Sequence, residues 1–151
     1  MSSRPSESDA QRLAELSAQA LFAKDDASRS LGVGIEEVRP GFARLRMTVR
    51  ADMVNGHGMC HGGLIFALAD SAFAVACNTH NAVTVAAAAS IDFLAPAHVH
   101  DALTAEAREL WRSKRSGIYE ISVTNQHGET IALFRGRSHR TGGPLVPVAE
   151  A

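Results

Sequence analysis

The sequence has few cysteines, no surplus of charge of either sign and no apolar run long enough to cross a membrane. Its two cysteines, Cys60 and Cys77, form no C-x-x-C pair and make no disulfide framework, which is typical of a reduced intracellular protein. The formal net charge of −1 argues against nucleic acid as a partner, because phosphate binding needs an excess of Lys and Arg. The longest apolar run, 64–77, is interrupted by Asp70 and Ser71 and is too short for a membrane span.

The start of the chain is polar and lacks the apolar core of a signal peptide, so we expect a cytoplasmic protein. A length of 151 residues and a hydrophobic fraction of 46% fit one globular domain with a substantial core. We expect a tail and short helix over 1–30, a folded domain over 31–140, and a flexible tail over 141–151, where Gly and Pro are frequent.

Hydrophobic periodicity divides the chain into helices and strands. It predicts an amphipathic helix over 11–23, after a disordered start and before a loop over 24–30. The segment 64–79 contains no Gly or Pro and is apolar on every side, which is typical of a buried helix. Strands are predicted over 31–38, 43–50, 83–94, 103–110, 118–124 and 130–139. The strand over 83–94 is apolar on both faces, so we expect it to be central in its sheet.

The order helix, two strands, loop, buried helix, four strands constrains the architecture. One antiparallel sheet can bury a helix on all sides only if it curls around that helix. The prediction is therefore an α+β protein of the hotdog type, in which a six-stranded antiparallel sheet wraps around one central helix over about 62–80.

Asp70 is the residue of the buried helix that packing does not explain. Burial of a carboxylate is costly unless the group is paired or functional, and no Lys or Arg occurs between Asp52 and Leu103. Such a site should perturb the pKa of the carboxyl group and suit it for catalysis. The alternative is a structural Asp that bonds to a Ser or to solvent at an interface.

The start of the same helix, Gly62-Gly63, offers backbone N–H groups at the positive end of the helix dipole. Such an N–H can stabilise a developing oxyanion, although the glycines can also be a simple tight entry to the helix. Gly62 and Asp70 are separated by roughly 12 Å of helix rise, so one site cannot use both from one chain. An antiparallel helix from a second copy brings them together, which predicts a homodimer with two sites across its interface.

Two further residues near the helix start have alternative roles. Asn55 can hold a substrate carbonyl, orient water, or be a turn residue in Asn-Gly. His61 can position the loop or cap the helix. His57, Cys60 and His61 have no fourth ligand at a familiar spacing, so we expect no metal site.

The segment NGHGMCHGGLIFALADSAFA, which begins at Asn55, closely resembles the signature of hotdog acyl-CoA thioesterases. It is most similar to the hydroxyphenylacetyl-CoA thioesterase branch of phenylacetic acid degradation, and later pieces agree: SIDFLAP from Ser90, GIYE from Gly117 and ALFRGRSHR from Ala132. The resemblance covers about residues 31–140. Some related aryl-CoA thioesterases carry a hydroxyl one turn after the carboxylate, where this chain has Ala74.

The resemblance implies that Asp70 is the nucleophile or general base, that the Gly62 N–H of the other subunit is the oxyanion donor, and that Asn55 and His61 orient the thioester and the loop. It implies no metal and no redox cofactor, coenzyme A being part of the substrate, and a homotetramer built from two dimers. We expect an apolar acyl pocket that includes Phe66 and Phe73. Residues expected to contact the CoA portion are Gly63, Ser90, Arg112, Lys114, Arg115, Ser116, Gly117 and Arg135.

Two other functions remain open from the sequence. A hotdog dehydratase or hydratase commonly uses a His base backed by a carboxylate, and no His stands at helical spacing from Asp70. A non-catalytic acyl-CoA binding module would keep the basic residues but would not need Asp70.

Overall fold

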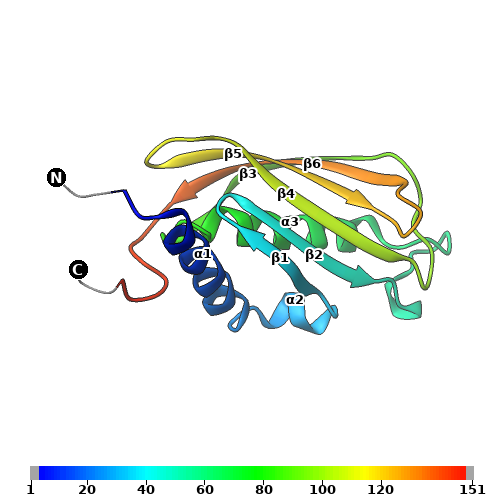
Figure 1. The fold of residues 1–151 in the computed structure, drawn as a ribbon. Coiled ribbons are helices and arrows are strands. Elements are labelled where there is room, and N and C mark those ends of the chain that lie inside the picture. Colours follow the sequence, from blue (N-terminus) through cyan, green and yellow to red (C-terminus); the bar gives the residue numbers. More distant parts are fainter. Residues whose placement is uncertain (1–3, 149–151) are drawn as a thin grey trace.

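The computed structural model describes residues 4–148 (Figure 1). Its helices are α1 (Glu7–Phe22), α2 (Asp26–Ser30) and α3 (Gly62–Asn78), and a 3-10 turn covers Ala51–Met53. Its strands are β1 (Gly34–Arg39), β2 (Phe42–Thr48), β3 (Thr84–Phe93), β4 (Ala102–Arg112), β5 (Ser116–Thr124) and β6 (Thr130–Arg140). Each predicted strand and the predicted central helix are present.

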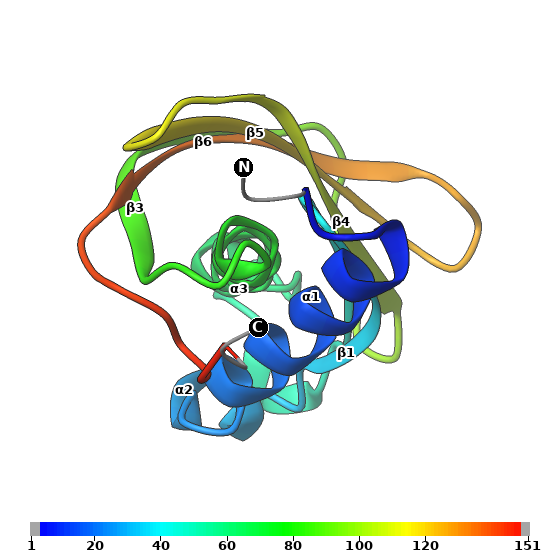
Figure 2. The ribbon, with the colours of Figure 1, turned by 60° about the vertical axis from the view of Figure 1, so that its left-hand side comes forward.

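The strands form one antiparallel sheet in the order β1-β2-β4-β5-β6-β3, and this sheet curls around α3 (Figure 2). The predicted hotdog architecture is confirmed. Alternation in β2 explains how the sheet faces the helix, because Leu45 and Met47 are buried while Arg44 and Arg46 point outward. Outside the core, Arg44 pairs with Glu106 of β4 at 2.9 Å, which joins neighbouring strands on the solvent side.

Aromatic side chains fill the space between α3 and the sheet. The Phe73 ring lies 5.4 Å from that of Tyr119 and 6.0 Å from that of Phe134, and Phe66 meets Phe134 edge-on at 5.0 Å. Phe73 is completely buried in this core cluster. It was expected to line the acyl pocket, and the structure gives it a packing role instead.

The N-terminal helix is longer than predicted and a second helix follows it. The Ser6 hydroxyl accepts the Asp9 N–H at 3.1 Å, and this N-cap starts α1 at Glu7, inside the segment expected to be disordered. The expected loop over 24–30 contains α2, which is a single short turn capped by Asp25. Residues 1–3 lie outside the described part of the chain.

Part of the predicted flexible tail is hydrogen-bonded to the segment after α3. The Asn81 Oδ1 atom accepts the N–H groups of Leu145 and Val146 at 2.9 Å each, and its Nδ2 donates to the Val146 carbonyl at 3.0 Å. The Val83 N–H donates to the Gly143 carbonyl at 2.9 Å. These hydrogen bonds connect 143–146 to the segment after α3, the flexibility expected of 141–151 stays a prediction, and residues 149–151 lie outside the described part.

Strand β3 lies at the edge of the sheet, where the sequence predicted a central strand. It pairs only with β6, and in the single chain Val85 and Phe93 are 47% and 52% exposed. An apolar edge strand with one free side is a template for pairing with another chain. Within residues 4–148 no helix is both long and apolar enough to span a membrane.

Gly136 on β6 provides a test of the core packing. A Cβ atom at this position would lie 2.7 Å from the Phe73 ring, whereas one at Gly34 on β1 would have no atom within 4 Å. We expect Gly136→Ala to lower the free energy of unfolding by about 1–3 kcal/mol through overpacking. Gly34→Ala is the control and should be neutral or slightly stabilising. Equal stabilities of the two variants in urea unfolding would contradict this packing.

Candidate active site

The start of α3 leaves one backbone donor free. His61 is the N-cap in extended conformation (φ −60°, ψ 129°), and its Nδ1 accepts the Gly63 N–H at 3.0 Å. The Leu64 N–H donates to the His61 carbonyl at 2.9 Å. The Gly62 N–H has no acceptor among residues 4–148. The structure thus gives His61 the capping role and leaves the Gly62 N–H free at the positive end of the helix.

Asn55 organises the loop that precedes the helix. Its Oδ1 accepts the N–H groups of His57 and Met59 at 2.9 and 3.2 Å, as expected of a turn residue. The loop is fixed at its far end because the Cys60 N–H donates to the Ala97 carbonyl at 2.8 Å and the His61 N–H to the Met53 carbonyl at 2.8 Å. The side-chain Oδ1 of Asn55 is therefore occupied, and of the side-chain amide only the Nδ2 atom remains available to a ligand.

An apolar hollow of about 320 Å³ opens beside Gly62. The ring of Phe93 forms one wall, and a Cβ atom at Gly62 would lie only 3.1 Å from it. No charged side chain lines this hollow; its walls come from Met59, Cys60, Gly62, Ile65, Phe93, Leu94, Ala95, Pro96 and Ala97. Such a wall suits an apolar group next to a backbone N–H donor.

Asp70 lies in the middle of α3 and is half-buried. Within residues 4–148 its carboxylate makes no side-chain hydrogen bond and no ion pair. Burial raises the pKa of Asp70, and the negative charge of Asp25 raises it further. A carboxylate that is unpaired and more basic than usual is suited to attack a carbonyl carbon or to accept a proton from water.

The Gly62 N–H and the Asp70 carboxylate do not form one site within a single chain. They lie on the same straight helix, eight residues and therefore roughly 12 Å apart along its axis. Positions 63, 67, 70 and 74 form a stripe of α3 that the sheet does not fully cover. Asp70 consequently faces the side of the helix that another chain can approach.

The residues expected to contact CoA fall into separate groups. Arg112, Lys114, Arg115 and Ser116 line one polar pocket of about 60 Å³ at the C-terminal end of α3. Ser90 and Arg135 face each other across β3 and β6 on the outer face of the sheet. The two glycines lie elsewhere: Gly63 gives its N–H to His61, and Gly117 is buried, with Tyr119 and Ser138 filling the space around it.

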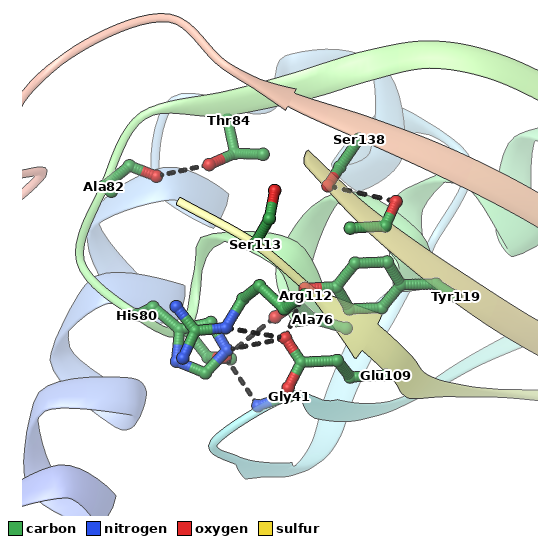
Figure 3. A network of polar contacts seen from close by, with 12 residues as sticks. Gly41, Ala76, His80, Ala82, Thr84, Glu109, Arg112, Ser113, Tyr119 and Ser138 are labelled. Carbon is green, nitrogen blue, oxygen red and sulfur yellow. Dashed lines mark hydrogen bonds and ion pairs between the residues drawn. The ribbon is translucent and has the colours of Figure 1, made fainter. Parts of the chain in front are cut away.

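A network of polar contacts underlies this pocket (Figure 3). Glu109 accepts hydrogen bonds from His80 at 3.1 Å and from the Tyr119 hydroxyl at 3.0 Å, and it forms an ion pair with Arg112 at 3.0 Å. Burial acts to raise the pKa of Glu109, but these donors outweigh it and the pKa is lowered. Sequence analysis missed this network, since its members come from segments far apart in the chain.

Among residues 4–148 no group of three or more His, Cys, Asp or Glu side chains is arranged to hold a metal ion. His57, Cys60 and His61, considered above as ligands, serve the loop and the helix cap: Cys60 is buried, and His61 bonds Gly63.

Residues 57–132 match the family model of the thioesterase superfamily. The chain belongs to this superfamily. The matched range includes Gly62, Asp70 and strands β3 to β5. The chain is 48% identical over 128 residues to the acyl-coenzyme A thioesterase PaaI of Escherichia coli K12, covering 85% of this chain and 91% of that protein. It is 33% identical to a putative esterase of Archaeoglobus fulgidus over 85% of this chain and 84% of the relative.

Solved structures of the superfamily agree with the fold. The E. coli PaaI protein, from the phenylacetic acid degradation operon, superimposes with a TM-score of 0.87 at 46% identity, over 89% of this chain and 97% of that one. The TT0310 protein of Thermus thermophilus superimposes with a TM-score of 0.75 at 37% identity, over 78% of this chain and 99% of that one.

The unpaired state of Asp70 predicts a cost in stability. Because the pKa of Asp70 is raised in the fold, the fold disfavours its ionised form. We expect Asp70→Asn to be more stable than the wild type at pH 7 by about 0.5–2 kcal/mol, the usual size of stabilising substitutions. The gain should disappear as the pH falls below about 4, where the unfolded carboxyl is protonated as well.

Urea unfolding at several pH values measures this effect. Asp52→Asn is the control, because Asp52 is exposed and pairs with Arg50, which lowers its pKa. That variant should gain no stability at neutral pH. An Asp70→Asn protein that is no more stable than the wild type would show that the fold does not strain this carboxylate.

Proposed function

We propose that the chain hydrolyses acyl-CoA thioesters to the free acid and CoA, with phenylacetyl-CoA or hydroxyphenylacetyl-CoA as substrate. The observation that carries this proposal is that α3 holds two polar groups without a partner among the described residues 4–148. One is the half-buried Asp70 carboxylate, and the other is the Gly62 N–H. The kinship with E. coli PaaI, an acyl-coenzyme A thioesterase from a phenylacetic acid degradation operon, supports the reaction and the substrate class.

The chemistry follows from the two groups. The thioester oxygen accepts the Gly62 N–H, which stabilises negative charge as the carbonyl carbon becomes tetrahedral. Asp70 either adds to that carbon, giving a mixed anhydride that water then cleaves, or removes a proton from the water that adds. In both cases the C–S bond breaks and CoA leaves as a thiolate. Asp70, Gly62 and water are sufficient for this reaction, and coenzyme A enters as part of the substrate.

The two groups have to come from two copies of the chain. Strand β3 offers the means: its free edge and its exposed Val85, Phe93 and Leu94 suit antiparallel pairing with β3 of a second copy. Such a twofold arrangement runs the two α3 helices antiparallel and places each Asp70 near the other chain's Gly62. The dimer therefore has two equivalent sites. Its further association into a tetramer stays a prediction.

The apolar hollow beside Gly62 is the proposed acyl pocket. Its wall of Phe93, Met59, Ile65 and Pro96 carries no charge, so an aromatic ring can be buried there with the carbonyl next to the Gly62 N–H. The Asn55 amide nitrogen is the further donor proposed to orient the thioester, and His61 keeps its predicted effect on the loop by capping α3.

The basic pocket at the end of α3 is the proposed seat of CoA phosphate. Lys114 and Arg115 are exposed there, and Ser116 contributes a hydroxyl. Arg112 forms an ion pair with Glu109, which partly neutralises its positive charge, so its attraction for a phosphate is weaker. Predicted CoA contacts also include Gly63, Gly117, Ser90 and Arg135, and the position of Ser90 opposite Arg135 in the β3–β6 pair supports a joint contact by these two.

A dehydratase would need a histidine backed by a carboxylate, and the structure contains such a pair, but it does not include Asp70. His80 pairs with Glu109 beyond the C-terminal end of α3, ten residues from Asp70. Glu109 also accepts a hydrogen bond from Tyr119 and forms an ion pair with Arg112. Contacts with Tyr119 and Arg112 thus hold the His80–Glu109 pair in a packing network. This arrangement favours hydrolysis at Asp70 over proton abstraction at His80.

Thiol release from a panel of acyl-CoAs tests the proposed reaction. The wild type should turn over arylacetyl thioesters faster than short aliphatic ones. Asp70→Asn, which keeps the size of the side chain but not its basicity, should lose roughly 10²–10⁴-fold or more in kcat. Substrate binding by the inactive variant should persist. Failure of the wild type to release thiol from any member of the panel would leave the binding module as the better description.

Gly62→Pro tests the backbone donor, because proline is tolerated at the first helical position and has no N–H. The extended conformation of His61 (ψ 129°) is the one that a residue before proline prefers. We expect a loss of roughly 10²–10³-fold in kcat. Gly62→Ala is the matched control, since it adds the same Cβ against Phe93 and keeps the N–H. Equal losses in the two variants would point to crowding at Phe93 instead of a lost donor.

Mixing the two inactive variants tests whether the site is shared. After exchange of subunits, a dimer of one Asp70→Asn chain and one Gly62→Pro chain has one intact site. Activity should return to roughly a quarter of the wild-type value, because half of the dimers are mixed and each has one working site of two. Sites contained within single chains would give no recovery on mixing.

A further inference from the structure

The turn that leads into α2 is joined to α3 by a chain of hydroxyl groups next to Asp70. The Oγ atoms of Ser71 and Ser28 lie 2.7 Å apart, and the Ser28 hydroxyl donates to Oδ2 of Asp25 at 2.5 Å. Oδ1 of Asp25 also accepts the Ser28 N–H at 2.9 Å as the N-cap of α2. Ser71 follows Asp70 directly in the helix, so this series of hydroxyl groups ends at the residue beside the reactive carboxylate.

The two hydroxyl groups have acceptors at the two ends of this link. Ser71 donates to the Ala67 carbonyl oxygen at 2.7 Å, one turn back on α3, and Ser28 donates to Asp25. The carboxylate is the stronger acceptor because it is charged. Asp25 therefore orients the Ser28 hydroxyl, and Ser71 is held both by its own helix and by its contact with Ser28 of α2.

We propose that Asp25 is a positioning residue for the Asp70 carboxylate, acting through the Ser28–Ser71 hydroxyl chain and through its own negative charge. The inference rests on the proposed role of Asp70 in thioester hydrolysis. Holding the neighbouring Ser71 fixes the turn of α3 that carries Asp70 without using either oxygen of that carboxylate. No hydroxyl side chain stands one turn after Asp70, where the residue is Ala74. The hydroxyl contact that holds this turn of α3 comes from Ser28 of α2 instead.

Charge provides the second part of the effect. Burial is the largest cause of the raised pKa of Asp70, and Asp25 is the charged group that adds to it. The Cys77 thiol on the same helix is neutral near pH 7, because its pKa is raised to about 12. Glu109 of β4 and Tyr119 of β5 bond to each other, and Glu109 also pairs with His80, at the far end of α3. Asp25 thus keeps the ionised Asp70 a stronger base.

The pH dependence of kcat/KM separates this role from a merely structural one. Asp25→Asn keeps a good N-cap for α2 but removes the charge, so the acid limb of the profile should move to lower pH. Asp25→Ser offers a second neutral cap and should move the limb in the same direction. Ser71→Ala breaks the hydroxyl chain without a change of charge and should lower kcat severalfold with little change in KM.

Asp26→Asn is the matched control, since it removes the same charge one residue further on, where the side chain is 91% exposed and pairs with Arg29. Its acid limb should coincide with that of the wild type. An unmoved limb in both Asp25 variants, or an equal shift in the Asp26 control, would overturn the inference while an inactive Asp70→Asn still upholds the proposed hydrolysis. Full activity of Asp70→Asn would overturn both.

Discussion

Helix α3 has to be buried on almost every side, mostly by a sheet of only six strands with α1 packed beside it, and the rest of the structure follows from that constraint. The sheet curls until Leu68, Ala72 and Phe73 are sealed against it, but the curl does not close. What remains partly open is the stripe of α3 that carries Asp70. The carboxylate therefore lies at the border of the core, dry enough for its pKa to rise and open enough for a substrate to reach it.

The open side of the curl also explains why assembly and catalysis belong together in the proposed function. Strand β3 ends the sheet with an apolar, unpaired edge, and a second sheet that continues from this edge covers the same side on which α3 is bare. A site made of Asp70 from one chain and Gly62 from the other is then a consequence of covering the helix. In the proposed dimer, the second copy would complete both the cover of α3 and the active site.

Sequence patterns predicted most of the fold because they report burial. Alternation located β2 and β4 to β6, and the lack of polar residues located α3. The same signal misplaced β3, since a strand that is apolar on both faces looks alike whether its neighbours are strands of its own sheet or a second chain. Asp70 stood out as a lone carboxylate in an apolar helix. The link from Asp25 to Ser71 could not be found, because it depends on how α2 packs against α3 and a five-residue helix leaves little periodicity.

Both residues that prepare the proposed site are helix N-caps, and capping explains how they do so. A cap satisfies one backbone N–H with a side-chain acceptor and leaves its neighbours alone. His61 takes the Gly63 N–H and in doing so keeps the Gly62 N–H free for an oxyanion. Asp25 takes the Ser28 N–H with one oxygen and has the other available for the hydroxyl chain toward Ser71. The His61 cap thus determines which N–H at the start of α3 stays free, and the Asp25 cap connects α2 to the turn of α3 that carries Asp70.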